Sequence, residues 1–189
     1  YSIKEINSLN KEIKSAIKFD LKKIILKRKN ICNLKFDQPK IMGVLNVTPD
    51  SFSDGGLFSN QSKACAQAKL MIANGAVIID VGGESTRPGS KIVNEKKEWK
   101  RIKNVIIEIK KKFPNTPLSL DTRKSYIMKK GIEHGVNIIN DVSGLNFDSK
   151  SFGIINSKKI PFILHHMQGT PDTMQKNPMY DDALLDIFD

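Results

Sequence analysis

The chain has 189 residues, enough for one domain with a sizeable core, and a formal net charge of +11. Only four of its 31 basic residues are arginines and the lysines are spread over every predicted helix, which is typical of solvated surface and argues against a nucleic-acid partner. No apolar run approaches the ~20 residues of a membrane span, and Cys32 and Cys65 lack metal or redox spacing. We therefore expect no membrane partner and a reducing, cytoplasmic compartment.

The first 38 residues are predicted to form an extension made of a helix and a hairpin. Residues 2–17 read as an amphipathic helix, because isoleucine and leucine recur there at steps of three and four residues. Two short apolar stretches, 23–26 and 31–36, flank a polar turn at 27–30, and apolar residues alternate in the second of them. This pattern predicts a β-hairpin over residues 23–36.

From residue 39 onward the sequence repeats a unit of one strand followed by one helix, which is typical of a parallel sheet. The expected strands are 41–47, 77–82, 118–121, 138–142 and 161–166. The expected helices are 62–74, 95–113, 124–134 and 149–158, with a fifth beginning near Asp181. The buried stripe of the second helix is predicted to comprise Trp99, Ile102, Ile106, Ile109 and Phe113.

The predicted fold class is α/β, a TIM-type (β/α)8 barrel of which residues 39–189 hold about five βα units. A complete barrel of this type typically needs ~250 residues. The chain starts at Tyr1 rather than Met and stops at Asp189 inside a helix-like pattern. We therefore expect a fragment of a longer chain.

A weak internal repeat relates the second and fourth strands. Residues 75–80 and 135–140 each run from a glycine through an apolar strand to a polar residue, Asp80 in one case and Asn140 in the other. The repeat predicts that these two residues occupy equivalent places in the sheet. Burying either without partners would cost roughly 2–7 kcal/mol, so each needs a ligand or a hydrogen-bond network.

Five predicted strands end in polar residues, and the first two are followed by unusually long loops, 48–61 and 83–94, rich in Gly, Pro and Ser. Sites of α/β barrels lie at the carboxyl ends of the strands, and long loops are often binding loops. The pattern predicts a site for a flat polar heterocycle, roofed by two loops. The strand-end residues are Asn46, Asp80, Asp121, Asn140 and His166.

Two long motifs carry a resemblance to a known family. Asn46-Val-Thr-Pro-Asp-Ser-Phe-Ser-Asp-Gly-Gly56 and Asp80-Val-Gly-Gly-Glu-Ser-Thr-Arg-Pro-Gly89 resemble the first and second signatures of the dihydropteroate synthases. The resemblance continues through residues 119–124, 138–144 and 166–169, and so covers roughly residues 31–189.

This resemblance implies roles for individual residues. Asn46 would contact Mg²⁺ on the substrate pyrophosphate, and Thr86 and Arg87 would hold the diphosphate. Asp121 and Asn140 would bind the pterin ring. Further positions that match the family's substrate site or border its p-aminobenzoate pocket are Asp80, Phe52 and Pro88.

The residue types suit these roles. A carboxylate such as Asp121 can accept two hydrogen bonds from the amino group and ring N–H of a pterin, and Asn140 can read a mixed donor and acceptor edge. A hydroxyl and a guanidinium fork, from Thr86 and Arg87, match phosphate oxygens. A carboxamide oxygen such as that of Asn46 suits Mg²⁺.

The implied reaction joins 6-hydroxymethyl-7,8-dihydropterin diphosphate to p-aminobenzoate, giving 7,8-dihydropteroate and pyrophosphate for folate biosynthesis. Asp121 and Arg87 would be the catalytic residues and Mg²⁺ the cofactor, and the resemblance further implies a homodimer when the chain is full length. His166 matches the family's His-Met-Gln-Gly and is expected behind the binding residues. His165 and His166, adjacent on one predicted strand, should point to opposite faces, which argues against a two-histidine metal site.

Two alternatives remain open at this point. One is a corrinoid-linked pterin methyltransferase, which should lack the loops that are intact here, and the other is a non-catalytic pterin-binding module. Several motifs of the family's carboxyl-terminal part do not occur in this sequence. We therefore expect the 189-residue chain to be inactive by itself.

Overall fold

A computed structural model describes residues 3–26, 29–48, 57–85, 90, 92–170, 173–175 and 177–188. The chain divides into two units, Tyr1–Lys35 and Phe36–Asp189. Among the described residues, no helix combines the length and the apolar character needed to cross a membrane.

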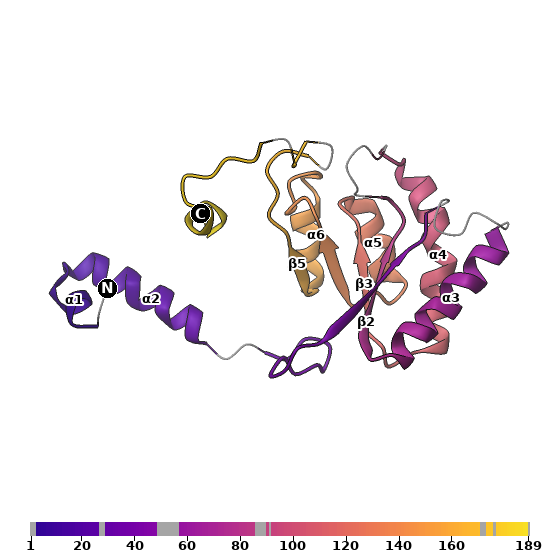
Figure 1. Ribbon diagram of the computed structural model, residues 1–189, viewed down its shortest axis with the longest axis horizontal. Helices are drawn as coiled ribbons and strands as arrows, with labels where there is room; N and C mark the ends of the chain where they lie inside the picture. The colour runs from indigo at the N-terminus through magenta and orange to yellow at the C-terminus, as the bar shows by residue number, and fades with distance from the viewer. Residues whose placement is uncertain are drawn as a thin grey trace. The chain divides into compact units, whose positions relative to one another are not determined.

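The first unit contains two helices where the sequence predicted one (Figure 1). They are α1 (Ile3–Ser8) and α2 (Lys11–Ile25). Asn10 separates them, because its backbone is extended and its side chain accepts a hydrogen bond from the Ile13 N–H at 2.9 Å. This is an N-cap, which satisfies a backbone donor that the helix itself leaves unpaired.

The predicted hairpin over 23–36 is wrong, because residues 23–25 belong to α2. The physical reason is that Ile17, Leu21 and Ile25 continue the helical spacing past residue 17. In the described part of 23–36, antiparallel pairing is limited to one bridge, Ile31 with Leu34. It closes a tight turn whose central residues, Cys32 and Asn33, have φ angles of 51° and 63°.

The second unit is built on a parallel sheet of five strands, and Figure 1 shows the helices that alternate with them. The strands are β1 (Ile41–Asn46), β2 (Ala76–Gly82), β3 (Leu118–Asp121), β4 (Ile138–Asp141) and β5 (Phe162–Leu164). Their spatial order is β1-β2-β3-β4-β5, so each strand pairs with its neighbour in the chain. Sequential parallel strands are the arrangement of an α/β barrel, and the predicted fold class is confirmed.

The helices form one layer, since consecutive helices from α3 to α6 contact one another. They are α3 (Leu57–Ala73), α4 (Glu95–Lys112), α5 (Ser125–Glu133), α6 (Ser151–Lys158) and, after β5, α7 (Ala183–Phe188). Each expected helix of this part is present within a few residues of its predicted bounds. The largest difference is α3, which begins at Leu57 and so shortens the predicted loop 48–61.

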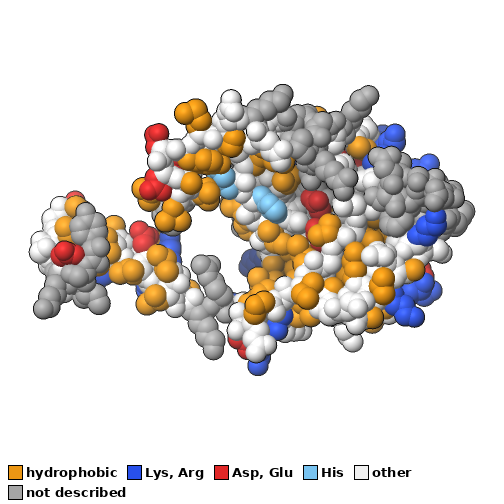
Figure 2. Space-filling model, in the orientation of Figure 1, with side chains coloured by type: hydrophobic (Ala, Val, Ile, Leu, Met, Phe, Trp, Pro, Cys, Tyr) orange, Lys and Arg blue, Asp and Glu red, His pale blue; other side chains and the backbone are white. Residues whose placement is uncertain are grey.

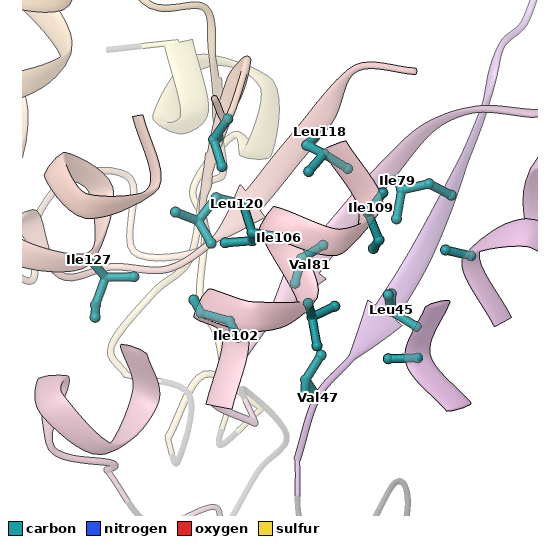
Figure 3. Close-up of a cluster of buried hydrophobic side chains, with 14 of the residues drawn as sticks. Leu45, Val47, Ile79, Val81, Ile102, Ile106, Ile109, Leu118, Leu120 and Ile127 are labelled. Carbon is teal, nitrogen blue, oxygen red and sulfur yellow. The ribbon is translucent and has the colours of Figure 1, made fainter. Parts of the chain in front are cut away.

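The hydrophobic core lies between the sheet and the helices (Figure 3). Leu118 and Leu120 of β3 point into it, so the alternation of a strand turns Ser119 and Asp121 to the other face. The predicted stripe of α4 is confirmed, because Ile102, Ile106 and Ile109 are fully buried and Trp99 and Phe113 pack against the core. The face of the sheet that carries polar residues therefore lies opposite the helices.

Candidate active site

One row of residues crosses the sheet at the carboxyl ends of its strands. Asn46 of β1 pairs with Gly82 of β2, Gly82 with Asp121 of β3, and Asp121 with Asn140 of β4. Ile163 of β5 ends the row beside Asn140. Residues in one row of a parallel sheet point to the same face, so the three polar side chains lie together at one mouth of the sheet.

Gly82 leaves open the space between the first two polar side chains of this row. A Cβ atom at Gly82 would lie 3.3 Å from Asp121 Oδ2 and 3.4 Å from Asn46 Oδ1. The oxygens of Asn46 and Asp121 therefore flank the same small volume, which a larger residue at position 82 would fill. Asn46 is exposed and Asp121 is partly buried, so this volume is open to a ligand.

Asp80 does not occupy a place equivalent to Asn140, and this prediction from the internal repeat is wrong. Asp80 pairs with Ser119, whereas the partner of Asn140 across β3 is Asp121, so Asp80 lies two residues deeper. The repeat placed both residues five positions after a glycine, but parallel strands need not start at the same height. The two side chains nevertheless meet, because Asn140 Nδ2 donates to Asp80 Oδ2 at 3.0 Å.

Burial sets the ionisation of Asp80. Only 2% of this residue is exposed, and loss of solvation raises the pKa of its carboxyl above the usual range. Three neighbours oppose this rise in pKa: the Ser119 hydroxyl, the Asn140 amide and the charge of His165. The Ser119 hydroxyl does so from nearby, without the geometry of a hydrogen bond.

His165 contributes to the site although its role was missed at the sequence level. Its Nε2 lies 2.7 Å from Asn140 Oδ1. His166 instead contacts Tyr180, with Nε2 3.0 Å from the phenol oxygen and ring centroids 5.6 Å apart. Figure 2 shows histidine and acidic side chains reaching the surface on the same face. The sequence motif pointed to His166. In the structure β5 ends at Leu164, before both histidines, and it is His165 that turns toward Asn140.

Asp121 supplies the carboxyl of the row, and the pKa of this carboxyl is strongly raised. Desolvation by burial and, after it, the negative charges of Asp80, Glu98, Asp141 and Glu84 raise its pKa from 3.8 to about 7. Strongly perturbed pKa values of buried carboxyls cluster at functional sites. A ligand that offers N–H donors to Asp121 would favour its ionised form.

A buried ion network lies next to the site, in the segments that follow β2 and β3, and no sequence pattern predicted it. Lys124 Nζ lies 2.8 Å from Glu84 Oε2 and 2.5 Å from Glu98 Oε2. Thr122 Oγ1 donates to Glu98 Oε1 at 2.8 Å, and Arg123 Nε donates to Glu84 Oε2 at 3.4 Å. The network joins the end of β2, the first turn of α4 and the segment after β3.

Ionisation within this network differs between its two carboxylates. Burial favours the neutral form of Glu84, but the hydrogen bonds from Lys124 and the Val93 N–H and the charges of Lys124 and Arg123 outweigh burial and lower its pKa. For Glu98 burial dominates and raises the pKa, in spite of Lys124 and Thr122. Glu84 is therefore the firmly ionised partner of Lys124.

Four of the predicted site residues lie outside the described residues: Phe52, Thr86, Arg87 and Pro88. The described residues on either side of 86–89 are held by several contacts. Ser90 Oγ donates to the Ser85 carbonyl at 2.5 Å, and the Val93 N–H donates to Glu84 Oε1 at 2.6 Å. Arg101 Nη1 donates to the Gly83 carbonyl at 2.7 Å. Glu84 thus ties together residues that precede and follow this segment.

The fold and the polar row define an α/β-barrel protein with a candidate binding site at the carboxyl ends of its strands. Residues 42–188 match the family described as pterin binding enzyme. The chain belongs to this family.

Similar proteins are dihydropteroate synthases. That of Neisseria meningitidis serogroup B is 44% identical over 153 residues, which are 80% of this chain and 53% of that protein. The Yersinia pestis enzyme in a sulfonamide drug complex is 41% identical with a TM-score of 0.74, over 82% of this chain and 56% of that one. The Xanthomonas albilineans enzyme with 4-aminobenzoic acid is 35% identical with a TM-score of 0.72, over 82% and 54%. The chain thus spans about half the length of the curated relatives it matches.

Proposed function

We propose that the protein acts as a dihydropteroate synthase, joining 6-hydroxymethyl-7,8-dihydropterin diphosphate to p-aminobenzoate. The observation that carries this proposal is the row of Asn46, Asp121 and Asn140 around Gly82. The row sets carboxylate and carboxamide groups at an open mouth of the sheet, in a chain of the pterin binding enzyme family.

We assign pterin recognition to Asp121 and Asn140. Ionised Asp121 would accept hydrogen bonds from the amino group and the ring N–H of the pterin. Asn140 uses one N–H toward Asp80 and its oxygen toward His165, so one N–H and one lone pair remain for the ligand. Asp80 was predicted to bind substrate. Because Asp80 is buried two residues deeper in the sheet than Asn140, we propose that Asp80 acts through its hydrogen bond with Asn140.

We assign the diphosphate to Thr86 and Arg87 and the border of the p-aminobenzoate pocket to Phe52 and Pro88. This part of the proposal rests on the motifs in the sequence. It is supported by the anchoring of Gly83 and Ser85 on one side of the segment and of Ser90 and Val93 on the other. A guanidinium held on anchored backbone would stabilise charge that grows on the leaving pyrophosphate.

The donor set fits Mg²⁺, with Asn46 as the proposed protein ligand. Asn46 Oδ1 and Asp121 Oδ2 flank one space, and Mg²⁺ prefers oxygen ligands. Within the described part of the chain, no cluster of three or more His, Cys, Asp or Glu side chains could hold a metal ion by itself. Mg²⁺ commonly keeps waters and phosphate oxygens beside one or two protein ligands, and when bound it would supply positive charge to the diphosphate.

In the proposed reaction the amine nitrogen of p-aminobenzoate forms a bond to the methylene carbon of the pterin. The bond from that carbon to the diphosphate oxygen breaks, and the amine loses one proton. Asp121 would stabilise positive charge that develops on the pterin, and Arg87 would stabilise the departing pyrophosphate. The residues named need only to bind and orient both substrates, and no side chain needs to act as a nucleophile.

The cellular compartment and the oligomeric state of the protein are also proposals. Cys32 and Cys65 are both free thiols, which supports a reducing compartment such as the cytoplasm. We propose a homodimer on the resemblance to the family alone.

The experiment is a paired measurement of ligand binding and product formation. We expect 6-hydroxymethylpterin to bind to the 189-residue chain in calorimetry, and the Arg87→Ala variant to lose affinity for the pterin diphosphate but not for 6-hydroxymethylpterin. Formation of dihydropteroate by the whole protein with Mg²⁺ would support the activity. Binding of neither compound to the unmodified protein would contradict the proposal.

A further inference from the structure

The Asn140 side chain lies in the middle of a hydrogen-bonded chain of three residues. Asn140 Nδ2 and Asp80 Oδ2 are 3.0 Å apart, and Asn140 Oδ1 and His165 Nε2 are 2.7 Å apart. The two ends of a carboxamide have nearly the same shape but opposite hydrogen-bonding character. The direction in which the amide is turned therefore decides what Asn140 offers to a ligand.

The direction of this chain follows from its carboxylate end. The amide nitrogen of Asn140 donates to the Asp80 carboxyl, so the amide oxygen, at the other end of the carboxamide, faces His165. The amide oxygen only accepts, so the short contact to His165 requires a proton on Nε2. His165 is thus the donor that begins the chain and Asp80 is the acceptor that ends it.

Burial makes this arrangement selective. Asp80 and Asn140 are 2% and 7% exposed, so a reversed amide would set its oxygen against the buried Asp80 carboxylate. Without His165 the amide oxygen would lose its donor, and a buried polar atom left unpaired is unfavourable. Asp80 and His165 hold the amide from opposite ends.

We propose that His165 is a positioning residue for ligand recognition. It donates from Nε2 to Asn140 Oδ1 and so fixes which edge of Asn140 shows an N–H and which shows a lone pair. The ligand class that this fixed pattern suits is a planar heterocycle with a donor beside an acceptor, and this step rests on the proposed pterin-binding function. His166 contacts Tyr180 and does not belong to this hydrogen-bonded chain of three residues.

A ligand-free measurement tests the positioning itself. In long-range ¹H–¹⁵N spectra of the unmodified protein, we expect the His165 imidazole to carry its proton on Nε2. We expect His165→Met to shift the side-chain amide resonances of Asn140, and His134→Met to leave them in place, because His134 makes an edge-to-face contact with Trp99 instead. A proton on Nδ1 alone, or Asn140 resonances that His165→Met does not move, would overturn the proposal.

A matched pair of variants tests the consequence for binding. His165→Gln keeps an N–H donor at about the same reach. His165→Glu has the same shape as His165→Gln, but an ionised Glu side chain offers only acceptors. We expect 6-hydroxymethylpterin to bind His165→Gln within about twofold of the unmodified protein, and His165→Glu and His165→Met about three- to tenfold more weakly. A cooperative thermal unfolding transition in His165→Met would show that this variant folds. Equal affinity of the Gln, Glu and Met variants would overturn the role in recognition.

The two measurements separate this proposal from the proposed function. If the unmodified protein binds no pterin but the amide resonances of Asn140 respond to His165→Met, the pterin function is contradicted and the positioning role is supported. If pterin binds and the resonances do not respond, the function is supported and His165 is not the positioning residue.

Discussion

The ammonium group of Lys124 lies 2.5 Å from the carboxylate of Glu98, and both side chains are buried. Glu98 belongs to the first turn of α4, and Lys124 precedes α5. Glu84, at 2.8 Å from the same ammonium group, adds the end of β2. One buried cation therefore links the segments that follow two neighbouring strands of the site.

The first prediction is that Lys124→Met destabilises the protein by about 3–5 kcal/mol, because it leaves the buried carboxylate of Glu98 without its cation and Glu84 with Arg123 alone. The matched control is Lys130→Met, which breaks the exposed pair of Lys130 with Glu133 and should cost far less. The measurement is the free energy of unfolding from urea titrations of both variants. Similar losses in the two would show that the buried network is not a main source of stability.

The second prediction concerns the pH dependence of stability and Asp121. Its pKa is about 7 in the folded protein against 3.8 in an exposed carboxyl, so between these values folding takes up a proton and stability falls as the pH rises. Asp121→Asn removes this ionisation. We expect the variant to be more stable than the unmodified protein by on the order of 4 kcal/mol near pH 8, and by less near pH 5. Urea titrations at both pH values measure the difference, and a pH-independent difference would contradict the raised pKa.

The third prediction is that the same variant binds ligand more weakly although it is more stable. An amide cannot accept two hydrogen bonds from a pterin with the strength of a carboxylate, and hydrogen bonds to a charged group contribute roughly 1.5–3 kcal/mol. We expect Asp121→Asn to lose about 10- to 150-fold in affinity for 6-hydroxymethylpterin. Calorimetry gives the affinity, and an unchanged value would show that Asp121 does not hold the ring.

Most of the second unit could be predicted from the sequence because local pattern and tertiary structure agree there. The run Leu118-Ser-Leu-Asp121 alternates apolar and polar residues, as a strand with one apolar face does, and the predicted bounds match β3. The stripe of α4 repeats at helical steps on one side. The hairpin over 23–36 failed because the short apolar stretch predicted as its first strand, 23–26, also fits a helix that continues from Ile17.

The site could be predicted only in part, because its contacts join residues far apart in the sequence. Polar strand ends pointed to Asn46, Asp121 and Asn140, since strand direction alone brings them to one edge. Glu98 and Lys124 look like surface charges in a lysine-rich chain, and only packing shows that both are buried. The height of Asp80 in the sheet and the turn of His165 toward Asn140 depend on strand register, which the local pattern does not specify.

The fourth prediction tests the tie that Glu84 makes across residues 86–89. Glu84→Gln removes one of the two negative charges that pair with Lys124 and weakens the acceptor for the Val93 N–H. We expect affinity for inorganic pyrophosphate with Mg²⁺ to fall several-fold, whereas 6-hydroxymethylpterin, which we assign to Asp121 and Asn140, should bind as before. Calorimetry with each compound distinguishes the two effects. An equal loss for both would mean that Glu84 acts on the whole site rather than on the diphosphate part.

The central claim is that the row at the carboxyl ends of the strands is where a pterin binds, and a chemical-shift titration with 6-hydroxymethylpterin tests it most directly. We expect the largest changes at the backbone amides of Gly82 and Asp121 and at the side-chain amides of Asn46 and Asn140, which line one mouth of the sheet. Changes that gather instead at the amino ends of the strands, or in the first unit, with the resonances of this row unmoved at saturation, would contradict the account.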